Sequence, residues 1–239
     1  MDFGIEIMLS SVDRRLDTLF LSPLAREVRQ RNLTYLTPAK LRALERDLRH
    51  VRSAGVAGDF LEFGVALGGS AVVIASHVEP PSEFHGYDVF GMIPPPGPGD
   101  GARSHARFAE IREGRSKGIG DDRYYGYLDD LYERVCGTFD SFGMKVDEGR
   151  FQLHRGRLEE TLDPRDTRPV AFAHIDCDWH APVMHCLSAM RHRLQPGGRV
   201  VLDDYMDYGG CRRAVEAFLA AAPSFRLVRQ KPSAALEKL

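Results

Sequence analysis

Two short apolar runs that each end abruptly in paired acids constrain the fold more than any other feature. One run covers 170–175 and the other 199–202, and a Leu-containing helical segment lies between them. The acids that follow the runs are Asp176, Asp178, Asp203 and Asp204. In an open sheet of parallel strands, the carboxyl ends of neighbouring strands meet at one crevice. The pattern therefore predicts an α/β protein in which four carboxylates converge.

Four carboxylates in one cleft repel one another strongly, and a bound cation relieves that repulsion. Mg²⁺ is the natural candidate, because it binds carboxylates together with substrate oxygens and water. The alternative is that the acids cap the two helices that follow, since Asp is a favoured N-cap residue. Capping uses one acid per helix, so four acids exceed that need. Metal binding is the favoured interpretation.

An earlier unit of the chain has the pattern of a nucleotide-type binding site. A strand, a glycine-bearing loop and a helix are expected at 60–63, 64–69 and 70–77. Loop glycines let backbone N–H groups approach a ligand, and a helix N-terminus favours negative charge. Roughly 20 residues further on, Asp88 ends the next strand, where an acid can bind a ribose diol. Glu62 is a second acid, which a purely structural strand does not need. A tight turn that requires glycine is the alternative explanation.

The order of the expected elements is that of one doubly wound α/β sheet that closes with a β-hairpin over 225–239. Residues 1–56 are expected to form an N-terminal helical segment, which covers the crevice or contacts another subunit. Residues 57–239 form the ligand-binding domain. The stretch 91–121, rich in Pro and Gly, is long for a compact domain, and its position predicts a lid.

Two further expectations concern individual elements. A helix over 122–142 follows the lid, and its apolar stripe, which includes Tyr124, is expected to be core. Pro196-Gly197-Gly198 is expected to stop a helix and to turn before the fifth strand. His174, inside the fourth strand, is expected to be a core histidine. Trp179 has two open roles, core packing or stacking on an acceptor.

Composition excludes several classes of partner. The chain has 239 residues and a formal net charge of -2, which gives no reason to expect nucleic acid or an anionic membrane as a partner. The four cysteines match no zinc or redox spacing, so free thiols in a reducing compartment are expected. The N-terminus lacks the apolar core of a signal peptide or membrane span, which predicts a cytoplasmic protein.

Seven strands with a terminal antiparallel pair resemble the class I S-adenosylmethionine-dependent methyltransferase fold, which is Rossmann-like. The closer resemblance is to the macrocin O-methyltransferase family, Mg²⁺-dependent enzymes that methylate sugar hydroxyls of natural products. It covers roughly 32–218. The motifs that carry it are GDFLEFGVALGGSA, YDVFGMIPPP, GRLEETL and HIDCDW…LQPGG…LDDY…GCRRAVEAF.

The resemblance implies specific roles for residues of this chain. It places the metal on Asp176, Asp203 and Asp204. It implies S-adenosylmethionine as cofactor and a small glycoside or polyol as acceptor, with a homo-oligomer expected. The residues implied for the cofactor are Glu62, Gly64, Val65, Gly69, Ser70, Asp88, Phe90, Gly156 and Arg157. One departure stands out: Cys177 and the run Trp179-His180-Ala181-Pro182 replace the family's usual residues, so macrocin itself is not assumed as substrate.

Methyl transfer from a sulfonium needs an aligned and deprotonated hydroxyl, and a divalent ion lowers the pKa of that hydroxyl. The base is Asp176, Asp178 or His180, and the sequence leaves these three open. A catechol-type acceptor is an alternative to a sugar. The alternatives of other classes are an NAD-dependent dehydrogenase, whose G-x-G-x-x-G spacing is missing, and a non-catalytic protein that binds an adenosyl ligand.

Overall fold

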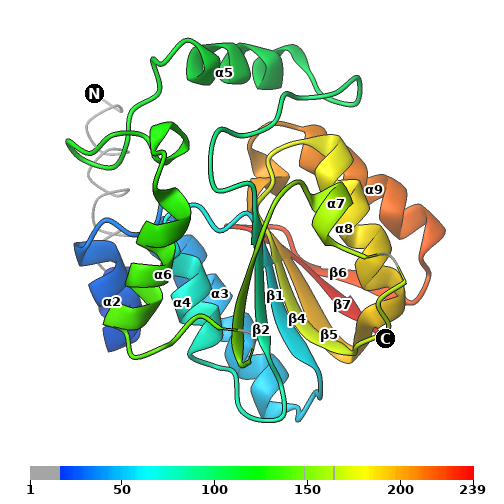
Figure 1. Ribbon diagram of the computed structural model, residues 1–239. Helices are drawn as coiled ribbons and strands as arrows, with labels where there is room; N and C mark the ends of the chain where they lie inside the picture. The colour runs from blue at the N-terminus through cyan, green and yellow to red at the C-terminus, as the bar shows by residue number, and fades with distance from the viewer. Residues whose placement is uncertain (1–16, 148, 164) are drawn as a thin grey trace, which may run out of the picture.

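The computed structural model describes residues 17–147, 149–163 and 165–239, which form a three-layer α/β sandwich (Figure 1). Its seven-stranded sheet has the order β3-β2-β1-β4-β5-β7-β6, with β7 antiparallel to both of its neighbours. The strands are β1 Asp59–Phe63, β2 Phe84–Asp88, β3 Phe151–Arg155, β4 Val170–Ile175, β5 Leu194–Leu202, β6 Phe225–Arg229 and β7 Ala234–Lys238. The predicted doubly wound sheet with its closing hairpin is confirmed.

Helices cover both faces of the sheet. On one face α2, α3, α4 and α6 pack together, and on the other α7, α8 and α9, while α5 lies above the carboxyl ends of the strands (Figure 1). The helices are α2 Pro23–Gln30, α3 Pro38–Ser53, α4 Gly69–Ala75, α5 Ala102–Arg112, α6 Leu131–Ser141, α7 Leu158–Thr161, α8 His180–Arg193 and α9 Gly210–Ala221, with 3-10 turns η1 Tyr125–Tyr127 and η2 Asp203–Met206. Among the helices described, none is long and apolar enough to cross a membrane.

The central strands are buried on both faces because helices cover both faces. Every residue of β1 and of β4 is buried, which explains why β4 is apolar at every position but His174 rather than alternating. Two hydrophobic clusters result, one on each side of the sheet. Packing in these clusters holds β4 and β5 in place, and so fixes the point at which the acids after these strands leave the sheet.

The N-terminal helices begin where capping residues predict. Thr37 caps α3, its side chain accepting a hydrogen bond from the N–H of Lys40, and Pro38 occupies the first helical position. Ser22 caps α2 in the same way. Apolar residues of both helices join the cluster around α4, so this segment is packed onto the sheet. The part of the expected first helix before residue 17 lies outside the described residues.

Two expected elements differ from the structure. The helix expected over 122–142 begins only at Leu131, because Tyr124, Tyr125 and Tyr127 pack on one another in an irregular segment around η1. The stretch 91–121, expected to be a loop that forms a lid, contains α5. The predicted helix is therefore wrong at its N-terminal end, and the predicted loop is helical in part.

The fifth strand also begins earlier than expected. β5 begins at Leu194, and Pro196-Gly197-Gly198 lies within it rather than before it. Val170 pairs with Leu194 and Phe172 with Arg199, so β5 carries extra residues opposite β4 at an irregularity. Gly197 has a φ of 78°, which a glycine adopts without strain. The predicted helix stop is correct, since α8 ends at Arg193. The four cysteines are free, as predicted.

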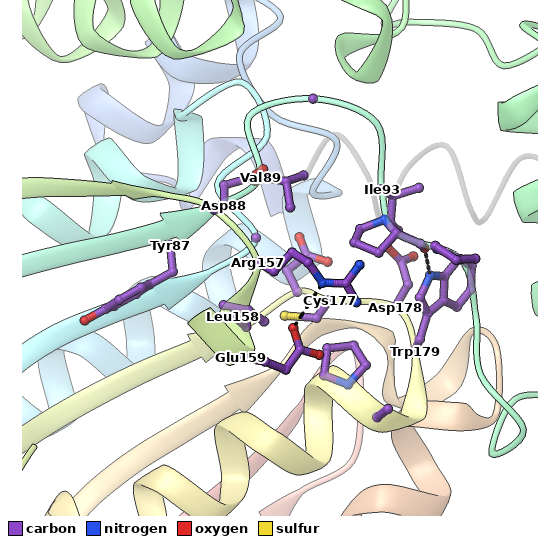
Figure 2. A pocket seen from close by; sticks show the side chains of 18 of the residues that line it. Tyr87, Asp88, Val89, Ile93, Arg157, Leu158, Glu159, Cys177, Asp178 and Trp179 are labelled. Carbon is purple, nitrogen blue, oxygen red and sulfur yellow. Dashed lines mark hydrogen bonds and ion pairs between the residues drawn. The ribbon is translucent and has the colours of Figure 1, made fainter. Parts of the chain in front are cut away.

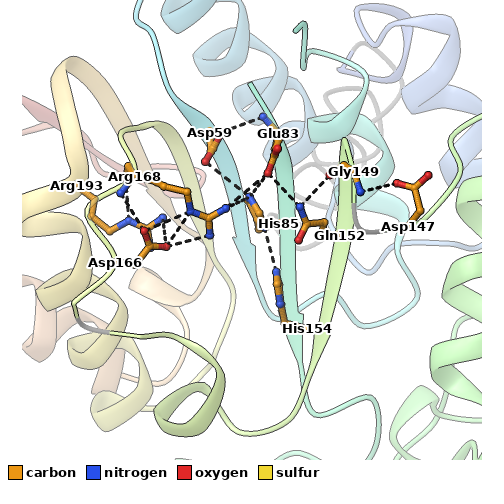
Figure 3. A network of polar contacts seen from close by, with 10 residues as sticks. All are labelled: Asp59, Glu83, His85, Asp147, Gly149, Gln152, His154, Asp166, Arg168 and Arg193. Atoms are coloured by element: carbon orange, nitrogen blue, oxygen red, sulfur yellow. Dashed lines mark hydrogen bonds and ion pairs between the residues drawn. The ribbon is translucent and has the colours of Figure 1, made fainter. Parts of the chain in front are cut away.

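A polar network joins the β2–β3 side of the sheet to the loop before β4 (Figure 3). Buried His85 lies at its centre, with Nδ1 3.1 Å from Nε2 of His154 and Nε2 3.1 Å from a guanidinium nitrogen of Arg168. Arg168 also forms an ion pair with Asp166 at 3.0 Å. The ring of Tyr87 stacks on His154 with centroids 4.4 Å apart.

Candidate functional site

Two neighbouring strands deliver aspartates to one point at the carboxyl edge of the sheet. β4 and β5 are adjacent and parallel, and Ile175 is paired with Leu202 at their ends. The next residues, Asp176 and Asp203, therefore leave the sheet side by side. One carboxylate oxygen from each of Asp176, Asp203 and Asp204 lies within 4.8 Å of the others. The predicted convergence of these acids is confirmed.

Hydrogen bonds hold this acidic cluster, which consists of Asp176, Asp203 and Asp204, from two sides. Asp178 has a left-handed backbone with a φ of 57°, and its N–H donates to Oδ2 of Asp204 over 2.8 Å. From α3, the ammonium of Lys40 donates to Oδ2 of Asp203 over 2.7 Å. The loop after β4 and helix α3 thus both form hydrogen bonds with the turn after β5.

Burial and mutual repulsion destabilise the charged form of the carboxylates in and beside the cluster. Burial, with repulsion from Asp203 and Asp204, raises the pKa of Asp176 well above its usual range. Burial also raises the pKa of Asp178 to about 7, and repulsion from Asp203 adds to the effect. Oδ1 of Asp203 is buried with no hydrogen-bond partner among the described residues. An unpartnered buried oxygen and three converging carboxylates fit a hard divalent cation such as Mg²⁺.

The alternative that these acids cap helices is contradicted. The N-cap residue of α8 is Trp179 and that of α9 is Gly209, and neither of these residues caps its helix through a side-chain hydrogen bond. The N–H of His180, at the start of α8, donates instead to Oδ1 of Asp100 in the lid, over 2.9 Å. Helix capping therefore does not explain the aspartates.

A first cavity, of about 270 Å³, lies over the carboxyl ends of β1 to β4 (Figure 2). In Figure 2, Asp88 and Arg157 lie on one side of it and Trp179 on the other. Pro94 and Pro95 contribute lining from the lid. Four of the residues predicted to bind the cofactor line this cavity, namely Gly64, Asp88, Gly156 and Arg157. The cavity thus adjoins the acidic cluster through Asp176, which also lines it.

Gly64 lets the loop after β1 lie directly against the loop after β4. A Cβ at this position would be 2.0 Å from the backbone oxygen of Asp176, and its φ of 91° lies in the left-handed region. The N–H of Asp176 donates to the carbonyl of Phe63 over 2.8 Å. A side chain at position 64 would displace Asp176, so the glycine is required by this close approach.

Asp88 binds the backbone of the loop after β1. Its Oδ2 accepts hydrogen bonds from the N–H groups of Val65 at 2.7 Å and Ala66 at 2.9 Å. Its Oδ1 accepts one from Phe90 at 2.7 Å. Burial raises the pKa of Asp88, and these N–H donors oppose the rise by stabilising the charged form. Asp88 lines the cavity at the end of β2, where a ribose-binding acid is expected.

Five other residues predicted to bind the cofactor do not line this cavity, nor the second cavity that is described below. They are Glu62, Val65, Gly69, Ser70 and Phe90. The N–H of Gly69 donates to the carbonyl of Leu33 over 3.0 Å, and a Cβ there would clash with the same oxygen. Glu62 is fully buried, with Oε1 2.8 Å from Nδ1 of His174. His174 is therefore the core histidine that the sequence predicted, and direct cofactor contacts for these five residues stay predictions.

A second cavity, of about 290 Å³, adjoins the first and contains the acidic cluster. Asp176 and Asp178 line both cavities, so they lie at the boundary between them. The walls of the second cavity come from the N-terminal segment, the lid, the segment before α6 and the turn after β5. These wall residues include Tyr35, Lys40, Arg103, Arg107, Tyr124, Tyr125, Asp207 and Tyr208.

Tyrosines form much of that wall, and for Tyr124 this corrects the expected role as helix core. The rings of Tyr124 and Tyr125 lie 4.5 Å apart, and Tyr35 meets Tyr125 edge to face at 5.7 Å. Arg107 lies over the ring of Tyr124 at 5.9 Å. Aromatic rings and the guanidinium groups of Arg103 and Arg107 thus line the same cavity as the carboxylates.

Trp179 and His180 both contact the segment 91–121, whose role as a lid stays a prediction. Trp179 is 2% exposed, and its Nε1 donates to the carbonyl of Pro94 over 2.9 Å. His180, one of three predicted bases, lines neither of the two cavities that the described residues enclose. A Cβ at Gly99 would be 2.7 Å from its ring, so the imidazole lies against the lid.

Sequence reasoning missed several residues of the second cavity. Lys40 carried a signal, because a lysine in the first turn of a helix is disfavoured by the helix dipole and needs another reason to be there. Arg103 and Arg107 carried none, since the helix that bears them was not predicted. Asp207 and Tyr208 follow the paired acids closely, and their proximity to them was the available signal.

The sheet order, the antiparallel β7 and a cavity across the carboxyl ends of β1 to β4 define a Rossmann-like class I methyltransferase fold. The family model of macrocin-O-methyltransferase (TylF) matches residues 25–223. This chain belongs to that family.

Individual relatives agree with this assignment. The 8-demethyl-8-(2,3-dimethoxy-alpha-L-rhamnosyl)-tetracenomycin-C 4'-O-methyltransferase of Streptomyces olivaceus is 31% identical over 172 residues, 70% of this chain and 60% of that protein. The O-methyltransferase NovP has a TM-score of 0.71 at 20% identity, covering 96% of this chain and 99% of its own. TomG from Streptomyces achromogenes, solved in complex with SAM, has a TM-score of 0.56 at 16% identity, covering 96% of both chains. The match thus spans 60% of the length of the curated relative, and the two solved structures show the fold.

Proposed function

We propose that this chain is an S-adenosylmethionine-dependent O-methyltransferase that methylates a sugar hydroxyl of a small natural product with the help of a divalent cation such as Mg²⁺. The observation that carries the proposal is the boundary between the two cavities, which Asp176 and Asp178 share. A donor in one cavity and an acceptor in the other would meet beside the acidic cluster. The rhamnosyl group in the name of the Streptomyces olivaceus relative supports a sugar acceptor.

The first cavity suits the methyl donor. Asp88 lies at the end of β2, the position from which an acid binds a ribose diol in this kind of fold. Gly156 and Arg157 follow β3 and would lie along the adenine side, while Pro94 gives an apolar surface from the lid. The SAM complex of TomG, which shares the fold, supports this assignment. A homo-oligomer and a cytoplasmic location stay predictions from the sequence.

The acids divide the remaining work between them. Asp176, Asp203 and Asp204 would hold the cation. A cation bound there would lower the pKa of the acceptor hydroxyl. Asp178 is the base that the geometry favours, because it lines both cavities while His180 lines neither, and because Asp176, which also lines both, belongs to the group that would hold the cation. Asp178 accepts the hydroxyl proton, and the oxygen then forms a bond to the methyl carbon as the carbon–sulfur bond breaks. The sulfur keeps the electron pair, so S-adenosylhomocysteine is the second product.

The walls of the second cavity would orient the acceptor. Tyr124 and Tyr125 present aromatic surfaces, which pack on the apolar face of a sugar ring or on an attached aromatic group. Trp179 keeps the lid closed through its bond to Pro94, which limits the access of water to the reacting atoms. Alignment and exclusion of water are the main requirements of this displacement.

A methyl-transfer assay tests the proposal directly. The purified chain is incubated with radiolabelled S-adenosylmethionine, Mg²⁺ and a panel of rhamnosylated small molecules and simple catechols. Labelled glycoside that disappears with EDTA supports the proposal, while labelled catechol alone points to the catechol-type alternative. Calorimetry with S-adenosylhomocysteine and with NAD⁺ separates the other classes, since tight binding of NAD⁺ alone would identify a dehydrogenase.

A further inference from the structure

Lys40 reaches the acidic cluster from outside the sheet. Its side chain is 17% exposed, and its ammonium lies 2.7 Å from Oδ2 of Asp203 and 3.1 Å from Oδ2 of Asp207. Both bonds are charge-assisted, which makes them stronger than neutral hydrogen bonds. A residue of the N-terminal segment therefore contacts one of the three converging carboxylates directly.

Local forces do not favour a lysine at this position. Lys40 is the third residue of α3, and its N–H donates to the capping hydroxyl of Thr37 over 3.2 Å. The positive end of the helix dipole lies in this first turn, where a cation is destabilised. Partial burial of the ammonium adds a desolvation cost. The two aspartates offset both effects, so the acidic cluster explains the lysine.

The two carboxylate oxygens of Asp203 have different surroundings. Oδ2 accepts the hydrogen bond from Lys40, whereas Oδ1 is buried with no hydrogen-bond partner among the described residues. A carboxylate that is held by one oxygen cannot rotate freely about its Cβ–Cγ bond. Lys40 thus fixes which oxygen of Asp203 stays open for another ligand.

Asp207 extends the same arrangement to the lid. Its carboxylate accepts the second hydrogen bond of Lys40, and its backbone carbonyl accepts one from a guanidinium nitrogen of Arg103 over 2.9 Å. Asp203 opens η2 and Asp207 follows it directly. The two bonds of Lys40 therefore tie both ends of this turn to α3.

We propose that Lys40 is a positioning residue of the cation site, which holds Oδ2 of Asp203 so that Oδ1 faces the cation. The inference rests on the cation binding that the proposed function includes. Groups that orient a metal-ligating carboxylate typically change metal affinity by about 10-fold to 100-fold when they are removed. A mere counter-ion would do the opposite, because its removal would strengthen the binding of another cation.

Calorimetric titration with Mn²⁺ alone distinguishes these two roles. Lys40→Met, which keeps the stem and removes the donor, should weaken Mn²⁺ binding by about tenfold. Lys40→Gln, which keeps an N–H donor without the charge, should lose less than Lys40→Met. The matched control is Arg42→Met on the same helix, since Arg42 pairs with Asp17 away from the cluster and should bind as the wild type does.

Binding by Lys40→Met that equals or exceeds that of the wild type would overturn the inference alone. Absence of Mn²⁺ binding by the wild type would overturn it together with the cation of the proposed function. Circular dichroism checks that each variant is folded. Should Lys40→Met not fold, Lys40→Gln is compared with Lys40→Arg: weaker binding by the glutamine variant supports the inference, and equal or tighter binding overturns it.

Discussion

The backbone N–H of Asp178 donates a hydrogen bond to Oδ2 of Asp204 over 2.8 Å and so joins the turn after β4 to the turn after β5. The residue proposed as base is therefore fixed to one of the residues proposed as cation ligands. Asp178 adopts a φ of 57°, which is uncommon for a residue with a Cβ and marks a position that its surroundings enforce. Base and cation site are expected to keep a constant geometry through the reaction.

Replacing both Asp203 and Asp204 by alanine should reduce methyl transfer by about a thousandfold, because a cation at this site is worth several kcal/mol in the transition state. Binding of S-adenosylhomocysteine should stay close to that of the wild type, since neither residue lines the first cavity. Radiometric assays and calorimetry measure the two quantities. Full activity of the double variant, or of the wild type in EDTA, would remove the cation from the proposal.

Asp178→Asn should lower kcat by about 100-fold to 10,000-fold, as expected when a general base is lost. The amide cannot accept the proton, yet it fills the same space, so Mn²⁺ and S-adenosylhomocysteine should still bind. His180→Gln is the matched variant at the start of α8 and should keep kcat near the wild-type value. A large loss with His180→Gln and none with Asp178→Asn would reverse the assignment of the base.

Trp179→Phe removes the hydrogen bond to the carbonyl of Pro94 while leaving an aromatic ring in the cavity wall. The lid should open more often, so limited proteolysis within 91–121 should become faster. The free energy of unfolding should fall by about 1 kcal/mol, the usual contribution of one such bond. Unchanged proteolysis would show that other contacts, such as the bond between His180 and Asp100, are sufficient to hold the lid.

Sequence predicted the acidic cluster because its cause is local. A strand that is buried on both faces is mostly apolar, so the change from Ile175 to Asp176 marks the place where β4 leaves the core. The same holds at Leu202 and Asp203. Adjacency of the two strands then follows from the order of the fold, and no long-range detail is needed to bring the acids together.

The acceptor side was predicted poorly because its residues meet only through tertiary contacts. Tyr35, Arg107 and Tyr124 come from three separate segments, and none of these segments has a periodicity that indicates a shared cavity. Tyr124 fits a helical stripe in sequence, but its packing on Tyr125 and Tyr127 replaces the helix. Local propensity therefore gave the wrong element at that position.

Acid should destabilise the fold partly through His154. Burial, with repulsion from His85 and Arg168, lowers the pKa of His154 to about 4 from an ordinary value of 6.5. Above pH 6.5 the residue is neutral in both states, and its contribution does not change. Between pH 6.5 and about pH 4, His154 takes up a proton in the unfolded chain but not in the folded chain. The free energy of unfolding therefore decreases as the pH is lowered through this range.

The size of that effect is on the order of 1 kcal/mol, because His154 is only partly buried and solvent screens its charge. Urea unfolding near pH 7.5 and near pH 5 measures it. His154→Gln should show a smaller loss between the two conditions than the wild type, since glutamine does not titrate. Equal losses in both proteins would assign the acid sensitivity to other groups.

The wall of the second cavity has a practical consequence for engineering. Tyr35 and Lys40 precede β1, and Arg103 and Arg107 belong to the insertion after β2, whereas the strand ends that contact the first cavity lie elsewhere in the chain. Chimeras that take only the N-terminal segment and α5 from a relative would change the choice of acceptor and leave Pro94 and Pro95, which line the first cavity, in place. Retargeting such a catalyst is then a matter of exchanging two peripheral pieces rather than redesigning its core.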